Sequence, residues 1–273
     1  MQGKFNKFIF FKKKGKIMAI VLKTMQEIEG IKKANQIIAR LYEDILPPYI
    51  KPGVSTYELN KIVEDYIRSQ GAIPGCIGVP GPYGAFPAGT CISVNEAVVH
   101  GVPSKDIILK EGDIVSVDTV TILDGYYGDA AITYPVGEID EESRRLLEVT
   151  EKARDIGIEA AVAGNRLGDI GHAIQSYVEK NGFSVVKDYA GHGVGLDMHE
   201  DPIVANYGRR GRGLKIENGM VLAIEPMVNV GTYKINMLDD GWTVVTKDGK
   251  KSAHFEHSIA IIDGKPVILS KKD

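Results

Sequence analysis

Two segments of this chain repeat each other, and the repeat limits the possible folds more than any other feature. One constant shift along the sequence, by 111 positions, aligns Gly53 with Gly164 and Gly71 with Gly182. The same shift aligns a tyrosine and three apolar residues, namely Tyr66 with Tyr177, Leu59 with Ile170, Val63 with Ile174 and Ile67 with Val178. Helical periodicity alone explains the apolar matches but not the glycines and the tyrosine. A single duplication of helices followed by strands predicts a two-fold α+β domain rather than a solenoid.

Capping boxes mark the start of two predicted helices in the first half. Thr24 with Glu27 forms one box and Ser55 with Glu58 forms the other, and apolar residues at helical spacing follow each of them. The second half is expected to hold two further helices, at 141–163 and 167–181. The sequence therefore predicts two helix pairs, one in each half of the repeat.

The clearest strand signal is a predicted β-hairpin. Residues 113–121 and 126–134 are rich in β-forming residues and flank Asp124-Gly125, a dipeptide typical of two-residue hairpin turns. Three later apolar runs are also expected to form strands, at 220–224, 242–245 and 255–262. Because no linker rich in Pro, Gly or Ser divides the chain, residues 18–273 are expected to form a single domain.

The hairpin brings two aspartates onto one face of the sheet. If Asp124-Gly125 is the turn, Asp118 pairs with Ala131, two positions from Asp129. The two aspartates are then diagonal neighbours with Cβ atoms about 7–8 Å apart. Like charges on a half-buried face are costly unless a cation joins them. A single strand aspartate more often faces solvent, but this pair predicts a site for one or two divalent metals.

Three further residues extend the candidate metal site. His192 lies between two glycines, which let a ligand approach closely, while Glu225 ends one apolar strand and Glu256 lies within another apolar run. Each alone is more often a loop residue or a charged strand end. With Asp118 and Asp129 they form four carboxylates and one imidazole, a set that suits Mn, Fe, Co or Zn and balances two divalent ions. A water bridging such ions becomes a nucleophile at neutral pH.

Several stretches of the chain resemble those of one known family. CISVNEAVVHGVP at 91–103, GHGVG at 191–195, IEPM at 224–227 and FEH at 255–257 are similar to segments of type I methionine aminopeptidases, in the same order and with compatible spacings. The resemblance runs from about Met18 to Ile262. It implies the pita-bread fold, an antiparallel sheet with an internal pseudo-two-fold that is backed by two helix pairs. It also implies an enzyme with two divalent ions (Co, Mn, Fe or Zn) that removes the initiator methionine from nascent proteins and prefers a small second residue.

The resemblance further implies a role for each candidate ligand. Asp129 and Glu256 match carboxylates that bridge the two metals, Asp118 matches a ligand of one ion, and His192 and Glu225 match ligands of the other. Glu225 also matches a proton shuttle between the attacking hydroxide and the leaving amine.

Two histidines and an apolar pocket complete the expected site. His199 matches a residue that hydrogen-bonds the scissile amide and stabilises the tetrahedral intermediate. His100 matches a residue that touches the substrate near its leaving side, although a core histidine in a strand is the alternative. A methionine side chain needs apolar, sulfur and aromatic neighbours, for which the candidates are Tyr83, Phe86, Cys91 and Trp242. Whether Cys76 joins them stays open, because the loop after it is longer than expected.

Composition restricts the partners and the compartment. Six lysines and no acids fall in residues 1–16, so the net charge of −3 leaves −9 on residues 17–273, which disfavours specific nucleic-acid binding. Two cysteines suit a reducing cytoplasm. No apolar run approaches the roughly 18 residues of a membrane span or forms a secretory signal of about 7–15 apolar residues with a cleavage site. We expect a cytoplasmic monomer whose partners are nascent polypeptide N-termini.

The N-terminal segment 1–17 is treated separately. It is expected to form a basic, disordered N-terminal extension, or to lie upstream of a start at Met18. Contact of this extension with the ribosome is a less favoured alternative.

Two other functions compete with methionine removal. An Xaa-Pro aminopeptidase or prolidase-type peptidase shares the fold, but such relatives usually carry an additional N-terminal domain. A metal-free binding protein of the same fold is the second alternative, and the intact set of five ligands argues against it.

Overall fold

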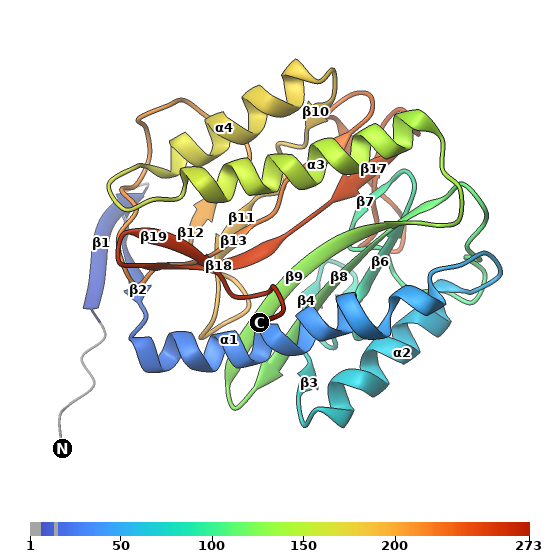
Figure 1. The fold of residues 1–273 in the computed structure, drawn as a ribbon, viewed down its shortest axis with the longest axis horizontal. Coiled ribbons are helices and arrows are strands. Elements are labelled where there is room, and N and C mark those ends of the chain that lie inside the picture. Colours follow the sequence, from blue (N-terminus) through green and yellow to red (C-terminus); the bar gives the residue numbers. More distant parts are fainter. Residues whose placement is uncertain (1–6, 14–15) are drawn as a thin grey trace.

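The computed structural model describes residues 7–13 and 16–273, and two helix pairs dominate its appearance (Figure 1). The helices α3 and α4 run side by side along the upper side of the view, whereas α1 and α2 run along the lower side with strands between the pairs. Their bounds are α1 Met25–Arg40, α2 Thr56–Ser69, α3 Glu141–Ala160 and α4 Leu167–Lys180. Both predicted capping boxes are formed. A π-helical turn (Leu41–Ile45) and a 3-10 turn (Pro47–Tyr49) follow α1.

The repeat predicted from the sequence is present in the structure. The bounds of α2 and α4 differ by 111 at both ends, and so do those of the short strands that follow them, β3 (Ile73–Pro74) and β10 (Ser184–Val185). Gly71 and Gly182 end the two helices with φ values of 74° and 86°. An L-residue adopts such values only with strain, which explains why glycine occurs at both places.

The predicted hairpin forms in the expected register. Strands β8 (Ile114–Leu123) and β9 (Tyr126–Pro135) make ten antiparallel pairs, from Leu123 opposite Tyr126 to Ile114 opposite Pro135. Asp124 and Gly125 have φ values of 51° and 81°, as a type I′ turn requires. Two further strands of this sheet pair with β8. Strand β3 pairs with Thr121 and Ile122 near its C-terminal end, and β6 (Cys91–Val94) pairs with its residues 115–118.

The second half forms a five-stranded antiparallel sheet. Its strands lie in the order β12 (Glu200–Val204), β11 (Gly191–Gly193), β13 (Val221–Ile224), β18 (His257–Ile262) and β19 (Lys265–Ile268). Two three-stranded sheets accompany it, β10 with β14 (Met227–Asn229) and β17 (Ser252–His254), and β15 (Ile235–Met237) with β16 (Val244–Thr246) and β7 (Ala97–Val99). The one sheet expected from the sequence is therefore several sheets, all with antiparallel pairs. The expected strand 255–262 is also broken, because it begins only at His257.

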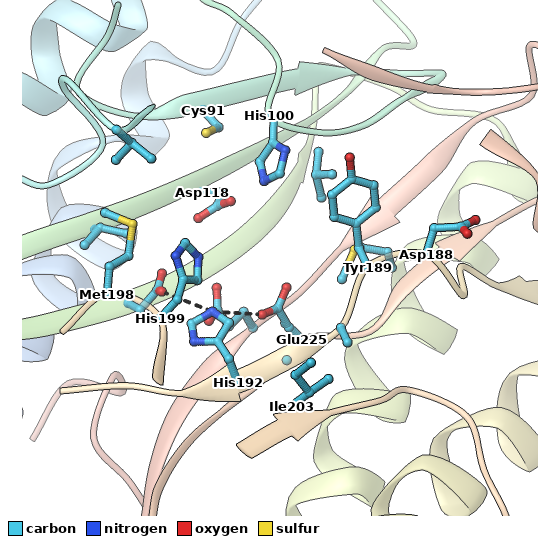
Figure 2. Close-up of a pocket in the computed structure, with 18 of the residues that line it drawn as sticks. Cys91, His100, Asp118, Asp188, Tyr189, His192, Met198, His199, Ile203 and Glu225 are labelled. Carbon is cyan, nitrogen blue, oxygen red and sulfur yellow. Dashed lines mark ion pairs between the residues drawn. The ribbon is translucent and has the colours of Figure 1, made fainter. Parts of the chain in front are cut away.

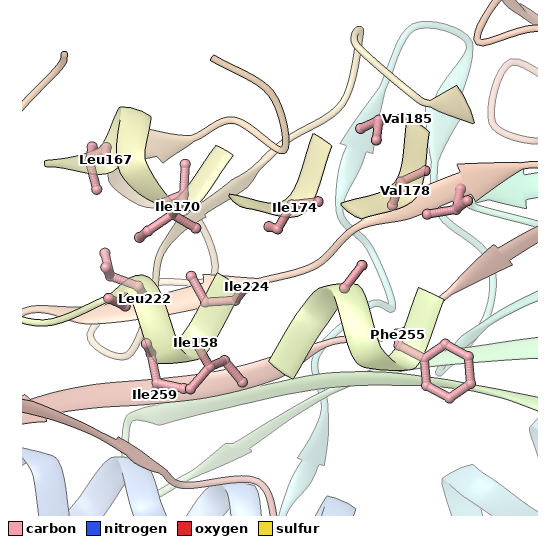
Figure 3. Packing of buried hydrophobic residues seen from close by; sticks show 14 of the residues in the cluster. Ile158, Leu167, Ile170, Ile174, Val178, Val185, Leu222, Ile224, Phe255 and Ile259 are labelled. Carbon is pink, nitrogen blue, oxygen red and sulfur yellow. The ribbon is translucent and has the colours of Figure 1, made fainter. Parts of the chain in front are cut away.

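The repeat-related helices α2 and α4 each pack an apolar face onto strands of their own half. In the second half, Ile170, Ile174 and Val178 of α4 are buried with residues of β13 and β18, as Figure 3 shows. In the first half, the repeat-related Leu59, Val63 and Ile67 of α2 are buried with residues of β8. Thus the rows of apolar residues that revealed the duplication are the rows that build the two cores.

The expectation for the N-terminal extension requires a correction. Strand β1 (Lys7–Lys13) pairs along its length with β2 (Lys16–Leu22), so 7–13 and 16–17 are not the disordered segment predicted. The two apolar runs of this region, each too short for a core helix, pair with each other instead. Residues 1–6 and 14–15 lie outside the described part of the chain. Among the described helices, none combines the length and apolar character needed to cross a membrane.

Helix α1 holds one of the candidate ligands in place. Gly128 of β9 lies directly under α1, where a Cβ atom would approach Asn35 N to 2.6 Å. The buried Asn35 side chain accepts a hydrogen bond from the backbone N of Asp129 (3.2 Å) and donates one to Ile31 O (3.0 Å). Close packing at Gly128 therefore fixes the backbone that carries Asp129.

We expect Gly128→Ala to lower the free energy of unfolding by about 1–3 kcal/mol, because the new methyl group meets backbone that cannot move aside. Metal affinity should fall as well, since α1 can no longer seat Asp129. The matched control is Gly182→Ala, which has open space around it but a positive φ and should cost about 1 kcal/mol without changing metal affinity. Denaturant titration and calorimetric metal titration measure both effects. Equal metal affinity in the two variants would contradict this role of Gly128.

Candidate metal centre

The five predicted ligands converge on one cavity of about 790 Å³, although they come from five separate places in the chain. Figure 2 shows Asp118, His192 and Glu225 turned toward a common space. Asp118 lies in β8, Asp129 in β9 and His192 in β11, whereas Glu225 follows β13 and Glu256 lies between β17 and β18. Both halves of the duplicated fold therefore contribute to the site.

The distances between these groups are those of a ligand cluster. His192 Nε2 lies 3.3 Å from Glu225 Oε1 and 3.8 Å from Asp129 Oδ2. Ligand atoms of Asp129, His192 and Glu256 all lie within 4.8 Å of one another. Asp118 lines the same cavity and is close enough for its charge to raise the pKa of both Asp129 and Glu256.

Hydrogen bonds to main-chain oxygens fix the backbone that carries three of these carboxylates. Glu256 N donates to Ala131 O of the hairpin at 2.8 Å, which places Glu256 beside the two aspartates. Asn206 Nδ2 donates to Glu225 O at 2.9 Å, and Ser258 Oγ donates to Asp129 O at 2.7 Å. Glu256 lies in the gap between β17 and β18, where its backbone N bonds to β9 and not to a neighbouring strand of β18. This gap therefore allows the Glu256 carboxylate to line the cavity.

The electrostatics of the site call for a cation. Loss of solvation raises the pKa of Asp118 to about 6 and that of Glu225 to about 7, and it raises the pKa of Asp129 and Glu256 well above their ordinary values. Repulsion between the carboxylates adds to the effect on Asp129 and Glu256. Glu256 Oε1 is buried and has no hydrogen-bond partner in the described structure. A divalent ion would supply that partner and keep the carboxylates ionised. The oxygen and imidazole donors therefore fit such an ion.

An apolar pocket adjoins the cluster. Phe86 and Trp242 meet edge to face with ring centroids 5.1 Å apart, and both line the cavity together with Cys91. Cys76, left open by the sequence, also lines it and is buried. Met198 adds a further sulfur-bearing side chain to the lining. This is the environment expected to accept a methionine side chain.

The prediction for Tyr83 is wrong. Its side chain is 78% exposed and does not line the cavity. The loop after Cys76 folds into the short hairpin β4 (Pro80–Gly81) and β5 (Gly84–Ala85), which carries Tyr83 at its tip. The ring packs instead against Gly241, while Gly81 packs against Trp242. The tip of this hairpin therefore holds the tyrosine at the outer surface rather than at the cavity wall.

Three histidines surround the cluster. The rings of His199 and His192 have centroids 4.5 Å apart, and the His100 ring lies 5.3 Å from that of Tyr189. Burial lowers the pKa of His100 to about 4, so this side chain is neutral at physiological pH. Sequence reasoning assigns no role to His254, yet its buried Nε2 lies 3.5 Å from Glu225 Oε2. In the sequence, the feature that could have indicated a role for His254 is its position two residues before the candidate ligand Glu256.

The fold and the cluster together define a metal-dependent peptidase. The profile of metallopeptidase family M24 matches residues 29–263, and the chain belongs to this family. It is therefore a metallopeptidase that binds divalent metal, and Asp129, His192 and Glu256 form a cluster that fits such an ion.

Within this family, the three relatives described next are all methionine aminopeptidases. A methionine aminopeptidase of Clostridium acetobutylicum is 52% identical over 251 residues, which are 92% of this chain and 98% of that protein. Methionine aminopeptidase 1 of Bacillus subtilis is 51% identical over 244 residues, 89% of this chain and 96% of that protein. The crystal structure of methionine aminopeptidase from Thermotoga maritima has a TM-score of 0.88 at 45% identity and covers 92% of this chain and 99% of its own. The pita-bread fold and the resemblance expected from the sequence are thus confirmed.

Metal binding should depend on pH in a defined direction. In the metal-free protein the pKa values of Asp118 (about 6) and Glu225 (about 7) lie above their ordinary values of 3.8 and 4.5. The folded state then holds more protons than the unfolded state, so the stability of the metal-free protein falls as pH rises from about 4 to 7. A bound cation removes this loss.

We therefore expect the rise in Tm on adding Mn²⁺ to chelator-treated protein to grow steadily from pH 5 to pH 8. Differential scanning calorimetry at matched ionic strength measures it. Glu225→Gln, which cannot ionise, should flatten the dependence. A metal-induced rise that is the same across this pH range would contradict the proposed competition between protons and metal.

Proposed function

We propose that this protein removes the N-terminal methionine from polypeptides with a small second residue. The observation that carries the proposal is the single cavity in which the carboxylate–imidazole cluster meets a pocket of Phe86, Cys91 and Trp242. The names of the relatives described above support it. The substrates are then the N-termini of nascent polypeptides, and the reaction takes place in the cytoplasm, where we expect the protein to act as a monomer.

The metal centre is proposed to hold two divalent ions. By the resemblance, Asp129 and Glu256 would hold both ions, Asp118 would hold one of them, and His192 with Glu225 would hold the other. Four carboxylates balance the charge of two such ions, and Co, Mn, Fe and Zn all suit these donors. When bound, the ions supply an acidified water as nucleophile and polarise the substrate carbonyl.

The protein side chains supply proton transfer and orientation. Glu225, which lies 3.3 Å from His192 within the cluster, is suited to take a proton from the nucleophile and pass it to the leaving amine. His199, which stands beside His192, would hydrogen-bond the scissile amide. His100, neutral and close to Trp242 (ring centroids 6.3 Å), would contact the substrate near its leaving side. The apolar pocket fixes the methionine so that its carbonyl meets the cluster.

The Xaa-Pro alternative has weaker support. The prolidase from Pyrococcus furiosus has a TM-score of 0.73 at 25% identity, and the match covers 92% of this chain but 66% of that one. The TM-score and the identity are both lower than for the methionine aminopeptidase structure from Thermotoga maritima. A pocket built from sulfur and aromatic groups also favours a long thioether over the varied first residues of Xaa-Pro substrates.

A peptide panel tests the function directly. We expect the protein loaded with Mn, Fe, Co or Zn to release the first residue from Met-Ala-Ser but not from Met-Lys-Ser or Ala-Pro-Ser, because only the first combines methionine with a small second residue. Released amino acids are quantified by chromatography. Faster cleavage of Ala-Pro-Ser than of Met-Ala-Ser would transfer the protein to the Xaa-Pro class.

Substitution of the cluster tests the assigned ligands. Asp118→Asn and Glu256→Gln should each reduce bound metal, measured by atomic emission, and lower kcat/KM by at least about 100-fold. Asp124→Asn is the matched control, because it changes an exposed aspartate at the turn of the same hairpin to a residue the turn accepts. It should retain both metal and activity. Retention of full activity by Asp118→Asn in metal-free buffer would refute the mechanism.

A further inference from the structure

Strand β12 connects the catalytic cavity to a second cavity. Successive residues of a strand point to opposite faces, and the odd-numbered residues here face outward while Pro202 and Val204 are buried. The odd face lines the catalytic cavity with His199, Asp201, Ile203, Ala205 and Tyr207. The last four of these also line the second cavity, which has a volume of about 710 Å³. The two cavities therefore share one wall.

The second cavity is cationic. Four basic side chains line it, Arg166, Arg209, Arg212 and Lys215, against a single acid, Asp201. All four are exposed. Such a concentration is unexpected on a chain whose charge over residues 17–273 is −9. The catalytic cavity has no comparable excess of positive charge. Its lysine, Lys187, is followed directly by the acidic Asp188, which lines the same cavity.

The loop that carries these arginines is held by its main chain. Gly168 N donates to Arg212 O at 2.9 Å, and Gly211 N donates to Asp169 Oδ1 at 2.7 Å. Arg166 Nη1 donates to Gly213 O at 2.8 Å. Asp169 also lies near Arg210, but within the described residues no ion pair forms at Arg209, Arg212 or Lys215. The backbone of the loop is thus fixed while three of its positive charges remain available.

One path open to a bound substrate leads toward this loop. In Figure 2, Cys91 and Met198 lie on one side of the cluster and Ile203 on the other. With a methionine side chain on the Cys91 side, the rest of the polypeptide can extend toward Ile203 and Tyr207, which line the same cavity. Strand β12 spans five residues, roughly 17 Å at about 3.3 Å per residue. An extended substrate would therefore reach the arginines with about its fourth to seventh residues.

We propose that the substrate polypeptide leaves the catalytic cavity along the odd-numbered face of β12 and that acidic side chains near its fourth to seventh positions bind Arg209, Arg212 and Lys215. The protein would then prefer nascent chains that are acidic just after their first three residues. This inference rests on the proposed function, since it takes the substrate to be a polypeptide with its N-terminus at the metal centre. Because the arginines are exposed, the attraction should act mainly on KM and weaken with salt.

Three heptapeptides with amidated C-termini test the preference, each beginning Met-Ala-Ser and continuing with four Glu, four Ser or four Lys. We expect KM to be about three- to tenfold lower for the Glu peptide than for the Lys peptide at low salt, with similar kcat. High salt should remove most of the difference. The double variant Arg209→Glu/Arg212→Glu should reverse the order, and Arg209→Lys/Arg212→Lys should restore it. Lys265→Glu is the matched control, because it reverses an exposed charge on β19, at the opposite edge of the same sheet, and should behave as wild type.

The outcomes separate this inference from the proposed function. Hydrolysis of Met-Ala-Ser reports for every variant whether the metal centre is assembled, and failure of the wild-type protein to cleave it would count against the function. Fluorescence anisotropy of labelled Glu and Lys peptides then tests the groove without cleavage. Equal KM and equal binding of the two peptides would overturn the proposal. So would an oligoribonucleotide that binds through Arg209 and Arg212 while the peptides show no difference, because the loop would then be a nucleic-acid surface.

Discussion

The mutual repulsion of four carboxylates in one enclosed space is the constraint on which the structure of this protein depends. Asp118, Asp129, Glu225 and Glu256 lie close enough for their charges to affect one another, and burial makes each of them costly to ionise. No apolar core would tolerate this arrangement unless a cation offset its cost. A bound cation would therefore contribute to the stability of the fold as well as to the chemistry, because its candidate ligands come from both halves of the molecule.

Much of the scaffold could be predicted from the sequence because local rules determine it. The hairpin register follows from the turn dipeptide Asp124-Gly125, whose two positive φ values match the twist of the strands. The capping boxes at Thr24 and Ser55 set where α1 and α2 begin. In these cases the deciding contacts lie within a few residues, so the local pattern contains the information.

The remaining features depend on contacts between distant parts of the chain. The place of Tyr83 between Cys76 and Phe86 in the sequence suggests a pocket residue, but its position is decided by Gly241, in the other half of the repeat. Similarly, Glu256 enters the site because its backbone N finds Ala131 O rather than a neighbouring strand. The pairing of β1 with β2 escapes prediction for the same reason, since each apolar run taken alone is too short to indicate its partner. Sequence patterns therefore identify the candidate metal ligands more readily than they identify the residues that line the surrounding pocket.

The duplication explains why the site lies where it does. The constant offset in residue number is kept in α2 with α4 and in β3 with β10, which are scaffold elements without candidate ligands. The strands that carry the cluster do not keep it. In the first half, β8 and β9 form ten pairs across a two-residue turn, whereas β13 and β18 form four pairs and are separated along the chain by four other strands. Packing of equivalent helices on both halves requires the repeat to persist, but a ligand cluster at their junction requires the two halves to present different side chains. The repeat is therefore strict in α2, α4 and the short strands that follow them, and it is lost at the junction, where the cavity, its apolar pocket and the face of β12 arise from the differences.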